Sequence, residues 1–228
     1  MNSVIPTWAL PSVPVVGTQD SFPVHRIYCV GRNYADHALE MGHDPTREPP
    51  FFFTKPADAV APGDGEVRYP LLTENLHHEV EMVVALKAGG ENIPVERALE
   101  TVFGYAVGLD LTRRDLQSRA KEKGHPWDMG KGFDRSAPIS AIVPVATCGH
   151  PARGAVTLAL NGELRQRGDL AQMSWKVPEV IAELSRYVEL RAGDLIFTGT
   201  PAGVGAVRRG DEMLAAVEGV ATLRVRMV

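Results

Sequence analysis

Two glutamates one residue apart, Glu79 and Glu81, open an apolar run that continues through Leu86. Because side chains alternate along a strand, both carboxylates lie on one face of it. Two charges about 6.5 Å apart in an effective dielectric near 20 repel by about 2 to 3 kcal/mol, so a cation is expected between them. A second apolar run, residues 102–109, ends at Asp110. Three carboxylates at the ends of neighbouring strands predict a site for Mg²⁺ or Mn²⁺.

The alternative for the glutamates is an edge strand whose polar face meets water. The residues that follow weigh against it, because both faces of the strand become apolar beyond the acids. Asp110 taken alone is more typical of a residue that starts a helix, so its value comes from the other two acids. The glutamate face continues with Val83 and Ala85, and the opposite face holds Val80, Met82, Val84 and Leu86.

A short helix over residues 34–41 is predicted between Asn33 as its N-cap and Gly42 just beyond its end. His37 and Glu40 are three apart and share one face of it. A solvated surface pair is the plain interpretation. The functional one is a general base, in which Glu40 polarises His37 and His37 removes a proton from water on a mobile lid.

Lys131 lies between two glycines, which favours a loop, and a surface lysine is the plain interpretation there. The glycine-rich stretch 199–205 lacks the lysine of a P-loop, and a simple turn between strands explains it equally well. Exposed backbone N–H groups together with the Thr200 hydroxyl could nevertheless hold a substrate carboxylate.

Strands outnumber helices along the chain. The predicted fold is a single mixed, β-dominated α+β domain over residues 25–228 with a few peripheral helices, preceded by an irregular arm, residues 1–24, that packs onto the body. Thr112 and Asp115 resemble a capping pair for a helix that Gly124 ends. Strands are predicted over 25–30, 51–56, 79–86, 102–109, 156–160, 163–166, 195–198 and 223–226, and helices over 34–41, 95–101, 116–121 and 178–188.

Composition excludes several classes of function. The chain has 228 residues and a net charge of −4, with its basic residues scattered, so nucleic acid is not an expected partner. Cys29 and Cys148 lack the spacing of a thiolate metal site, which fits a reducing compartment. The start of the chain has no basic region before its prolines, so neither export nor membrane insertion is expected, and the predicted location is the cytoplasm.

Six motifs taken together resemble the fumarylacetoacetate hydrolase family, from about residue 25 to the end of the chain. Within that family the chain is most similar to the short, single-domain acylpyruvases and fumarylpyruvate hydrolases. The joint order and spacing of the motifs are specific, although no single motif is. They are Val30-Gly31-Arg32-Asn33-Tyr34-Ala35-Asp36-His37, Phe53-Thr54-Lys55-Pro56, His78-Glu79-Val80-Glu81, Gly104 to Gln117, Gly130-Lys131-Gly132-Phe133-Asp134 and Thr198 to Gly205.

The resemblance implies a β-sandwich roll, a homodimer, and Mg²⁺ or Mn²⁺ held by Glu79, Glu81 and Asp110. It implies that His37 and Glu40 activate water on a lid that orders when ligand binds. The positions at which relatives contact substrate are Lys131, Gln117 and Thr200, and Arg32 and Arg114 are further candidates for binding a carboxylate.

The expected reaction is hydrolysis of a carbon–carbon bond in a 2,4-dioxo acid, an acylpyruvate, to pyruvate and a second acid. His37 would deprotonate water for attack on the C4 carbonyl, and the dication with Lys131 would stabilise the departing enolate. Decarboxylation of oxaloacetate or isomerisation of a 2-hydroxydienoate would use the same site. A different class is a non-catalytic binding domain in which the acids form a closed structural metal site.

Overall fold

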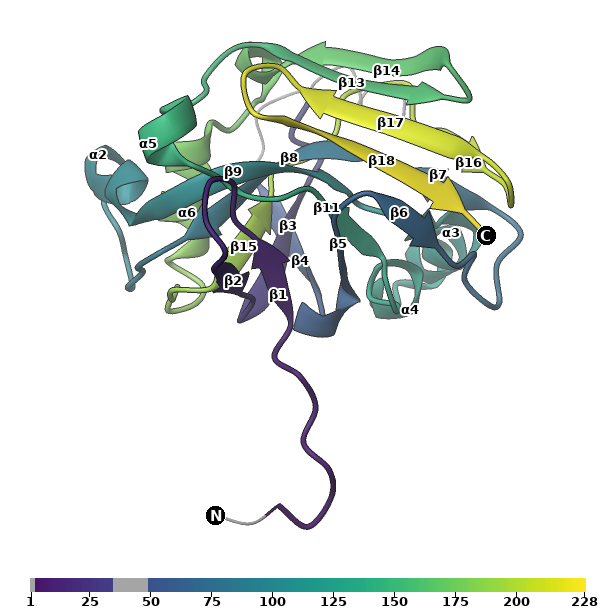
Figure 1. Cartoon of the computed structure of the whole chain (residues 1–228), viewed down its shortest axis with the longest axis horizontal. Helices are drawn as coiled ribbons and strands as arrows, with labels where there is room; N and C mark the ends of the chain where they lie inside the picture. Colours follow the sequence, from purple (N-terminus) through teal and green to yellow (C-terminus); the bar gives the residue numbers. More distant parts are fainter. Residues whose placement is uncertain (1–2, 35–48) are drawn as a thin grey trace.

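We describe a computed structural model of the chain over residues 3–34 and 49–228. Two stacked sheets form its body, and short helices lie around their edges (Figure 1). The larger sheet runs β4 (Phe51–Lys55), β3 (Arg26–Gly31), β15 (Asp194–Phe197), β8 (Val80–Leu86), β9 (Val102–Leu109), β11 (Ala137–Ile139) and β5 (Val60–Pro62), with β12 (Val143–Pro144) on β9. The smaller sheet runs β14 (Glu163–Asp169), β13 (Ala155–Leu160), β17 (Glu212–Val217), β18 (Ala221–Met227) and β6 (Gly65–Val67).

The strand β8 lies in the middle of the larger sheet and is buried along its whole length. Its side chains alternate as the sequence predicts. Val80, Met82, Val84 and Leu86 join the main core between the two sheets, whereas Val83 and Ala85 belong to a second core on the opposite face. This burial on both faces excludes the solvated edge strand, and the mixed, β-dominated fold is confirmed.

The second core lies beneath the N-terminal segment. A hairpin of β1 (Ser12–Pro14) and β2 (Ser21–Pro23) covers it, with Val13 and Phe22 pointing inward. The prediction of an irregular arm is therefore wrong for this part, because alternate apolar residues give the segment one buried face. Residues 3–10 extend away from the body (Figure 1).

A third, small sheet brings the functional segments together. It pairs β7 (Leu76–His78) with β10 (Thr112–Arg113) on one side and β16 (Gly205–Val207) on the other. Glu79 follows β7, Asp110 precedes β10 by two residues, and the 199–205 loop leads into β16. The backbone N–H of Asp110 donates to the carbonyl of Glu79 at 2.9 Å, which fixes these two acids beside each other.

The helices are short. No helix in the described part of the chain has both the length and the apolar character needed to cross a membrane. The prediction over 95–101 is realised as α2 followed by a 3₁₀ turn, and Gly124 ends α3 with a φ of 65° as expected. The helices are α2 (Val95–Ala98), α3 (Arg114–Lys123), α4 (Asp128–Lys131), α5 (Val145–Cys148) and α6 (Val177–Leu184).

Two local predictions are wrong. Asp115 does not pair with Thr112 as a cap, because its carboxylate accepts from the Thr73 hydroxyl at 2.7 Å and thereby holds the loop before β7. The helix predicted over 178–188 is shorter, because α6 ends at Leu184 and leaves Tyr187 exposed beyond it. Asn161 and Gly162 join β13 to β14 in a tight hairpin, and both have the positive φ of a type I′ turn, 52° and 83°.

Candidate active site

Glu79, Glu81 and Asp110 form one buried cluster. Each of the three residues is 5% exposed or less, and ligand oxygens of all three lie within 4.8 Å of one another. The acids come from the junction of β7 with β8, from β8 itself and from the end of β9. The predicted convergence of the three carboxylates is therefore confirmed, although Glu79 stands at a break between two strands and not inside one.

A separate group orients each acid. Gly199 donates its backbone N–H to Glu81 Oε2 at 2.7 Å. The guanidinium of Arg114 binds Glu79 Oε1, and Lys55 Nζ lies 2.8 Å from Asp110 Oδ1. Groups of this kind hold ligand carboxylates in place around a metal ion.

Lys131 bridges two of the acids. Its ammonium donates to Glu79 Oε2 at 2.9 Å and to Asp110 Oδ2 at 2.6 Å, and the side chain is almost fully buried. Burial works to lower the pKa of Lys131, but the charges of Asp110 and Glu79 outweigh it and raise the pKa. The glycines beside Lys131 indicated an exposed loop, and this is wrong because Lys131 ends α4, which packs against α3 through Gly130.

The charges around Glu81 are not compensated to the same degree. Burial, followed by the negative charges of Asp110 and Glu79, raises the pKa of Glu81 well above its usual range. Asp110 Oδ1, although it lies near Lys55, accepts no directed hydrogen bond from the described residues. A dication would compensate the negative charge at Glu81 and would give Asp110 Oδ1 a bonding partner. The three carboxylates therefore fit Mg²⁺ or Mn²⁺ as a donor set.

Gln166 links the smaller sheet to this cluster. Its Oε1 accepts from the Val80 N–H at 3.1 Å and from His78 Nδ1 at 2.8 Å, while Nε2 donates to the Thr200 hydroxyl oxygen at 2.8 Å and to the Pro201 carbonyl at 2.9 Å. Thr200 in turn donates its hydroxyl proton to the Val80 carbonyl at 2.8 Å. The amide therefore holds the backbone between the two glutamates.

Replacing Gln166 with leucine is expected to lower the free energy of unfolding by about 2 to 4 kcal/mol, because several buried polar groups lose their partner at once. Urea denaturation measures the loss. The matched control is Arg167→Leu at the next, exposed position of β14, where we expect a change within about 0.5 kcal/mol. Equal stability of wild type and Gln166→Leu would show that the network does not support the fold.

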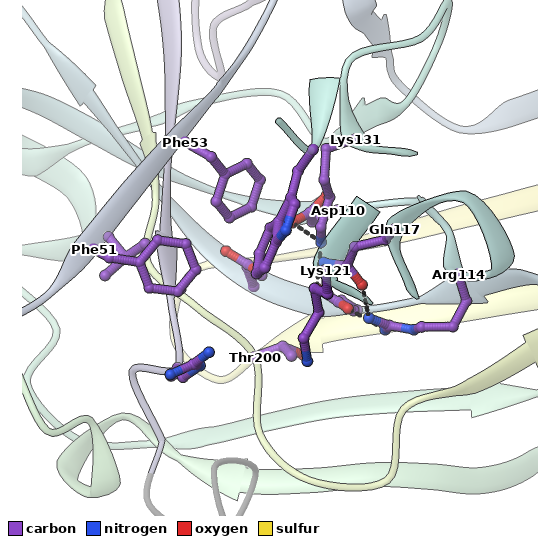
Figure 2. Close-up of a pocket in the computed structure, with 14 residues that line it drawn as sticks. Phe51, Phe53, Asp110, Arg114, Gln117, Lys121, Lys131 and Thr200 are labelled. Atoms are coloured by element: carbon purple, nitrogen blue, oxygen red, sulfur yellow. Dashed lines mark hydrogen bonds and ion pairs between the residues drawn. The ribbon is translucent and has the colours of Figure 1, made fainter. Parts of the chain in front are cut away.

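A pocket opens onto the acids. Its inner lining includes Arg114, Gln117 and Lys131, and one side is an aromatic wall made of Phe51, Phe53 and Trp127. Figure 2 shows Phe51, Phe53, Arg114 and Gln117 around Asp110 and Lys131. Arg32, Lys121 and Thr200 also line the pocket.

Comparison with known proteins matches the part of the chain that the sequence motifs indicated. The sequence model of the family described as fumarylacetoacetate (FAA) hydrolase C-terminal matches residues 26–228. The chain belongs to the fumarylacetoacetate hydrolase family. It is 45% identical over 201 residues to a mitochondrial oxaloacetate tautomerase of Rattus norvegicus, which covers 88% of this chain and 90% of the relative. It is 43% identical over 180 residues to a fumarylpyruvate hydrolase of Ralstonia sp, with coverage of 79% and 93%.

A solved member of the family has nearly the same fold. The crystal structure of fumarylpyruvate hydrolase from Pseudomonas aeruginosa, in complex with Mn²⁺ and pyruvate, superposes with a TM-score of 0.98 at 55% identity and covers 100% of this chain and 99% of that one. A structure described as a putative fumarylpyruvate hydrolase from Burkholderia cenocepacia gives 0.94 at 55% identity, with coverage of 100% and 98%.

The predicted site residues divide into two groups in this member of the fumarylacetoacetate hydrolase family, those that line one pocket and those that lie outside the described residues. The three acids, Lys131, Arg114, Gln117, Arg32 and Thr200 gather around one pocket. Arg114 and Thr200 direct hydrogen bonds to protein groups, and so does the Gly199 N–H that was expected to face a ligand. His37 and Glu40 lie outside the described residues.

Two buried or pocket-lining cations were not predicted. Lys55 is 2% exposed and contacts Asp110, and Lys121 lines the pocket from α3. A signal for the first was available, because Phe51, Phe53 and Lys55 alternate along one strand and so share a face. For Lys121 the signal was its helical spacing of seven residues from Arg114.

Proposed function

We propose that this protein is a divalent-metal-dependent hydrolase that cleaves the carbon–carbon bond of a 2,4-dioxo acid, with fumarylpyruvate as the substrate to test first. The observation that carries the proposal is the buried cluster of Glu79, Glu81 and Asp110 at the base of a pocket, with Lys131 across it. The names of relatives that share most of the chain support the same reaction class.

The three acids would hold Mg²⁺ or Mn²⁺, which when bound supplies a Lewis acid for the negative charge that develops on the pyruvyl half of the substrate. Lys131 adds a fixed positive charge at the same place, and its burial strengthens that charge's effect on a reacting group. Lys55 and Arg114 keep two of the acids in position throughout the reaction. Gln117 lines the pocket beside Arg114, where it can contact the substrate.

Water would attack the C4 carbonyl, the C3–C4 bond would break, and C3 would take up a proton to give pyruvate and the second acid. We assign proton removal from that water to His37, oriented by Glu40, on the strength of their spacing and the family motif.

Replacing His37 with alanine is expected to lower kcat by about 10²- to 10⁴-fold, since a general base contributes a factor of this size. Mn²⁺ affinity should stay the same, because the acids and their partners are untouched. Steady-state kinetics and calorimetric titration with Mn²⁺ measure the two quantities. A wild-type rate in His37→Ala would exclude the proposed base.

A second candidate is conversion of oxaloacetate at the same site, by tautomerisation or by decarboxylation, because relatives at 45% identity are named oxaloacetate tautomerases. Isomerisation of a 2-hydroxydienoate belongs to the same group of enolate reactions. A panel of oxaloacetate and acylpyruvates, assayed with Mn²⁺ before and after EDTA, separates these activities. The pocket reaching the acids argues against a closed structural metal site.

The wider proposal includes a catalytic domain over residues 25–228, a homodimer, and a cytoplasmic location. The family resemblance supports the dimer, and light scattering on the purified protein tests it: twice the chain mass of 24.7 kDa is expected, and a single chain mass would contradict it.

A further inference from the structure

The outer end of the pocket carries two cations, Arg32 and Lys121. Both are exposed, and neither forms an ion pair with an acid of residues 3–34 or 49–228. Burial, followed by the positive charges of Arg32 and Arg114, lowers the pKa of Lys121. The two cations therefore repel each other, and an anion bound between them would relieve this repulsion.

Helical geometry separates this outer pair from the inner site. Arg114, Gln117 and Lys121 lie at positions i, i+3 and i+7 of α3, so they share one face of the helix. The first two are buried and joined by a hydrogen bond, and Arg114 is bound to Glu79. Figure 2 shows the Lys121 side chain running away from Lys131 and Asp110.

The charges of the inner site balance without Arg32 and Lys121. Three acids face the three cations Lys55, Lys131 and Arg114, so a bound dication leaves two positive charges in excess. The carboxylate of a 2-oxo acid and the enolate charge that forms during cleavage balance those two. Arg32 and Lys121 lie outside this balance, so they are available to bind a further anion.

Arg32 is held in an unusual backbone conformation at this place. Its φ of 56° is left-handed, which is unfavourable for a residue with a side chain and is typical of functional sites. Phe51 packs directly on the backbone of Gly31, where any side chain would collide with the ring. The Arg32 guanidinium lies over that ring, 5.4 Å from its centre, beside the edge-on contact of Phe51 with Trp127.

We propose that Arg32 and Lys121 bind a second carboxylate at the far end of the substrate, on the acyl side of the bond that breaks. The aromatic wall of Phe51, Phe53 and Trp127 would contact the planar chain between the two ends. This inference rests on the proposed function and narrows it: the preferred substrates are 2,4-dioxo dicarboxylates, and acylpyruvates with an uncharged acyl group are poorer ones.

The test compares two substrates that differ at this end, fumarylpyruvate and acetylpyruvate, using the full-length Mn²⁺-loaded protein. We expect Lys121→Gln to lower kcat/KM for fumarylpyruvate about tenfold and Arg32→Asn with Lys121→Gln about a hundredfold, with acetylpyruvate changed less than about twofold. Asparagine is chosen at position 32 because it tolerates the left-handed conformation. Lys123→Gln, exposed on the same helix and outside the pocket lining, is the matched control.

Equal losses on both substrates, or no loss on either, would overturn the assignment of the second carboxylate. A wild-type protein that cleaves neither substrate would instead overturn the proposed function. The outer pair is then tested alone by calorimetric titration of fumarate into the Mn²⁺-loaded protein. Binding about tenfold weaker in Lys121→Gln than in wild type supports the pair, and equal binding overturns it.

Discussion

Replacing Glu81 with glutamine is expected to abolish divalent-cation binding and to lower turnover by at least about 10³-fold, while the metal-free protein stays within about 1 kcal/mol of wild-type stability. The two effects differ in origin. The negative charge of Glu81 is buried beside two other acids, which raises its pKa, so the fold gains little from that charge. Glutamine keeps an oxygen that accepts from the Gly199 N–H.

Calorimetric Mn²⁺ titration, kinetics, and urea denaturation in EDTA measure the three quantities for Glu81→Gln. Glu100→Gln, at an exposed position of the 3₁₀ turn Leu99–Thr101, is the matched control and should change none of them. Retention of wild-type Mn²⁺ affinity in Glu81→Gln would contradict the assignment of this carboxylate as a ligand. A loss of several kcal/mol in EDTA would contradict the account of its charge.

Replacing Lys131 with methionine is expected to lower the stability of the metal-free protein and to leave Mn²⁺ able to restore it. Removing the ammonium that bridges Glu79 and Asp110 leaves two buried carboxylates short of one positive charge, which costs about 3 to 5 kcal/mol in the metal-free protein. A divalent cation supplies positive charge to the same oxygens, so adding Mn²⁺ should raise Tm more in Lys131→Met than in wild type. Turnover should fall by about 10²- to 10³-fold even with Mn²⁺ present, because a fixed charge near the reacting atoms is gone.

Differential scanning calorimetry with and without Mn²⁺ measures the stability part of this prediction. Lys131→Arg keeps the charge and serves as a second variant should the methionine variant not fold, and it should lose less stability in EDTA. Lys123→Met, exposed at the end of α3, is the control for the substitution itself. An equal Mn²⁺-induced rise of Tm in wild type and Lys131→Met would contradict the electrostatic account.

Much of the inner site could be predicted from the sequence because local rules determine it. The period of two along β8 places Glu81 with Val83 and Ala85, and burial on both faces of the strand follows from the same pattern. The acids converge because β8 and β9 are adjacent antiparallel strands, so the start of β8 lies beside the end of β9.

The remaining parts depend on contacts between segments far apart in the chain. Lys131 is buried only because α4 packs against α3 and β4, and glycine flanks alone indicate exposure. Asp115 has the right spacing for a cap, but the Thr73 hydroxyl competes for its carboxylate. Gln166, in the smaller sheet, forms a hydrogen bond with His78, which lies 88 residues away in the sequence. No local pattern encodes such a contact.

The most direct test of the central claim is hydrolysis of fumarylpyruvate in H₂¹⁸O by the EDTA-treated protein, before and after Mn²⁺ is restored. We expect fumarate and pyruvate in equal amounts only after Mn²⁺ addition, with one ¹⁸O in the newly formed carboxyl group of fumarate, because water attacks the C4 carbonyl. Cleavage that persists in EDTA, or the absence of cleavage with Mn²⁺ restored, would contradict it.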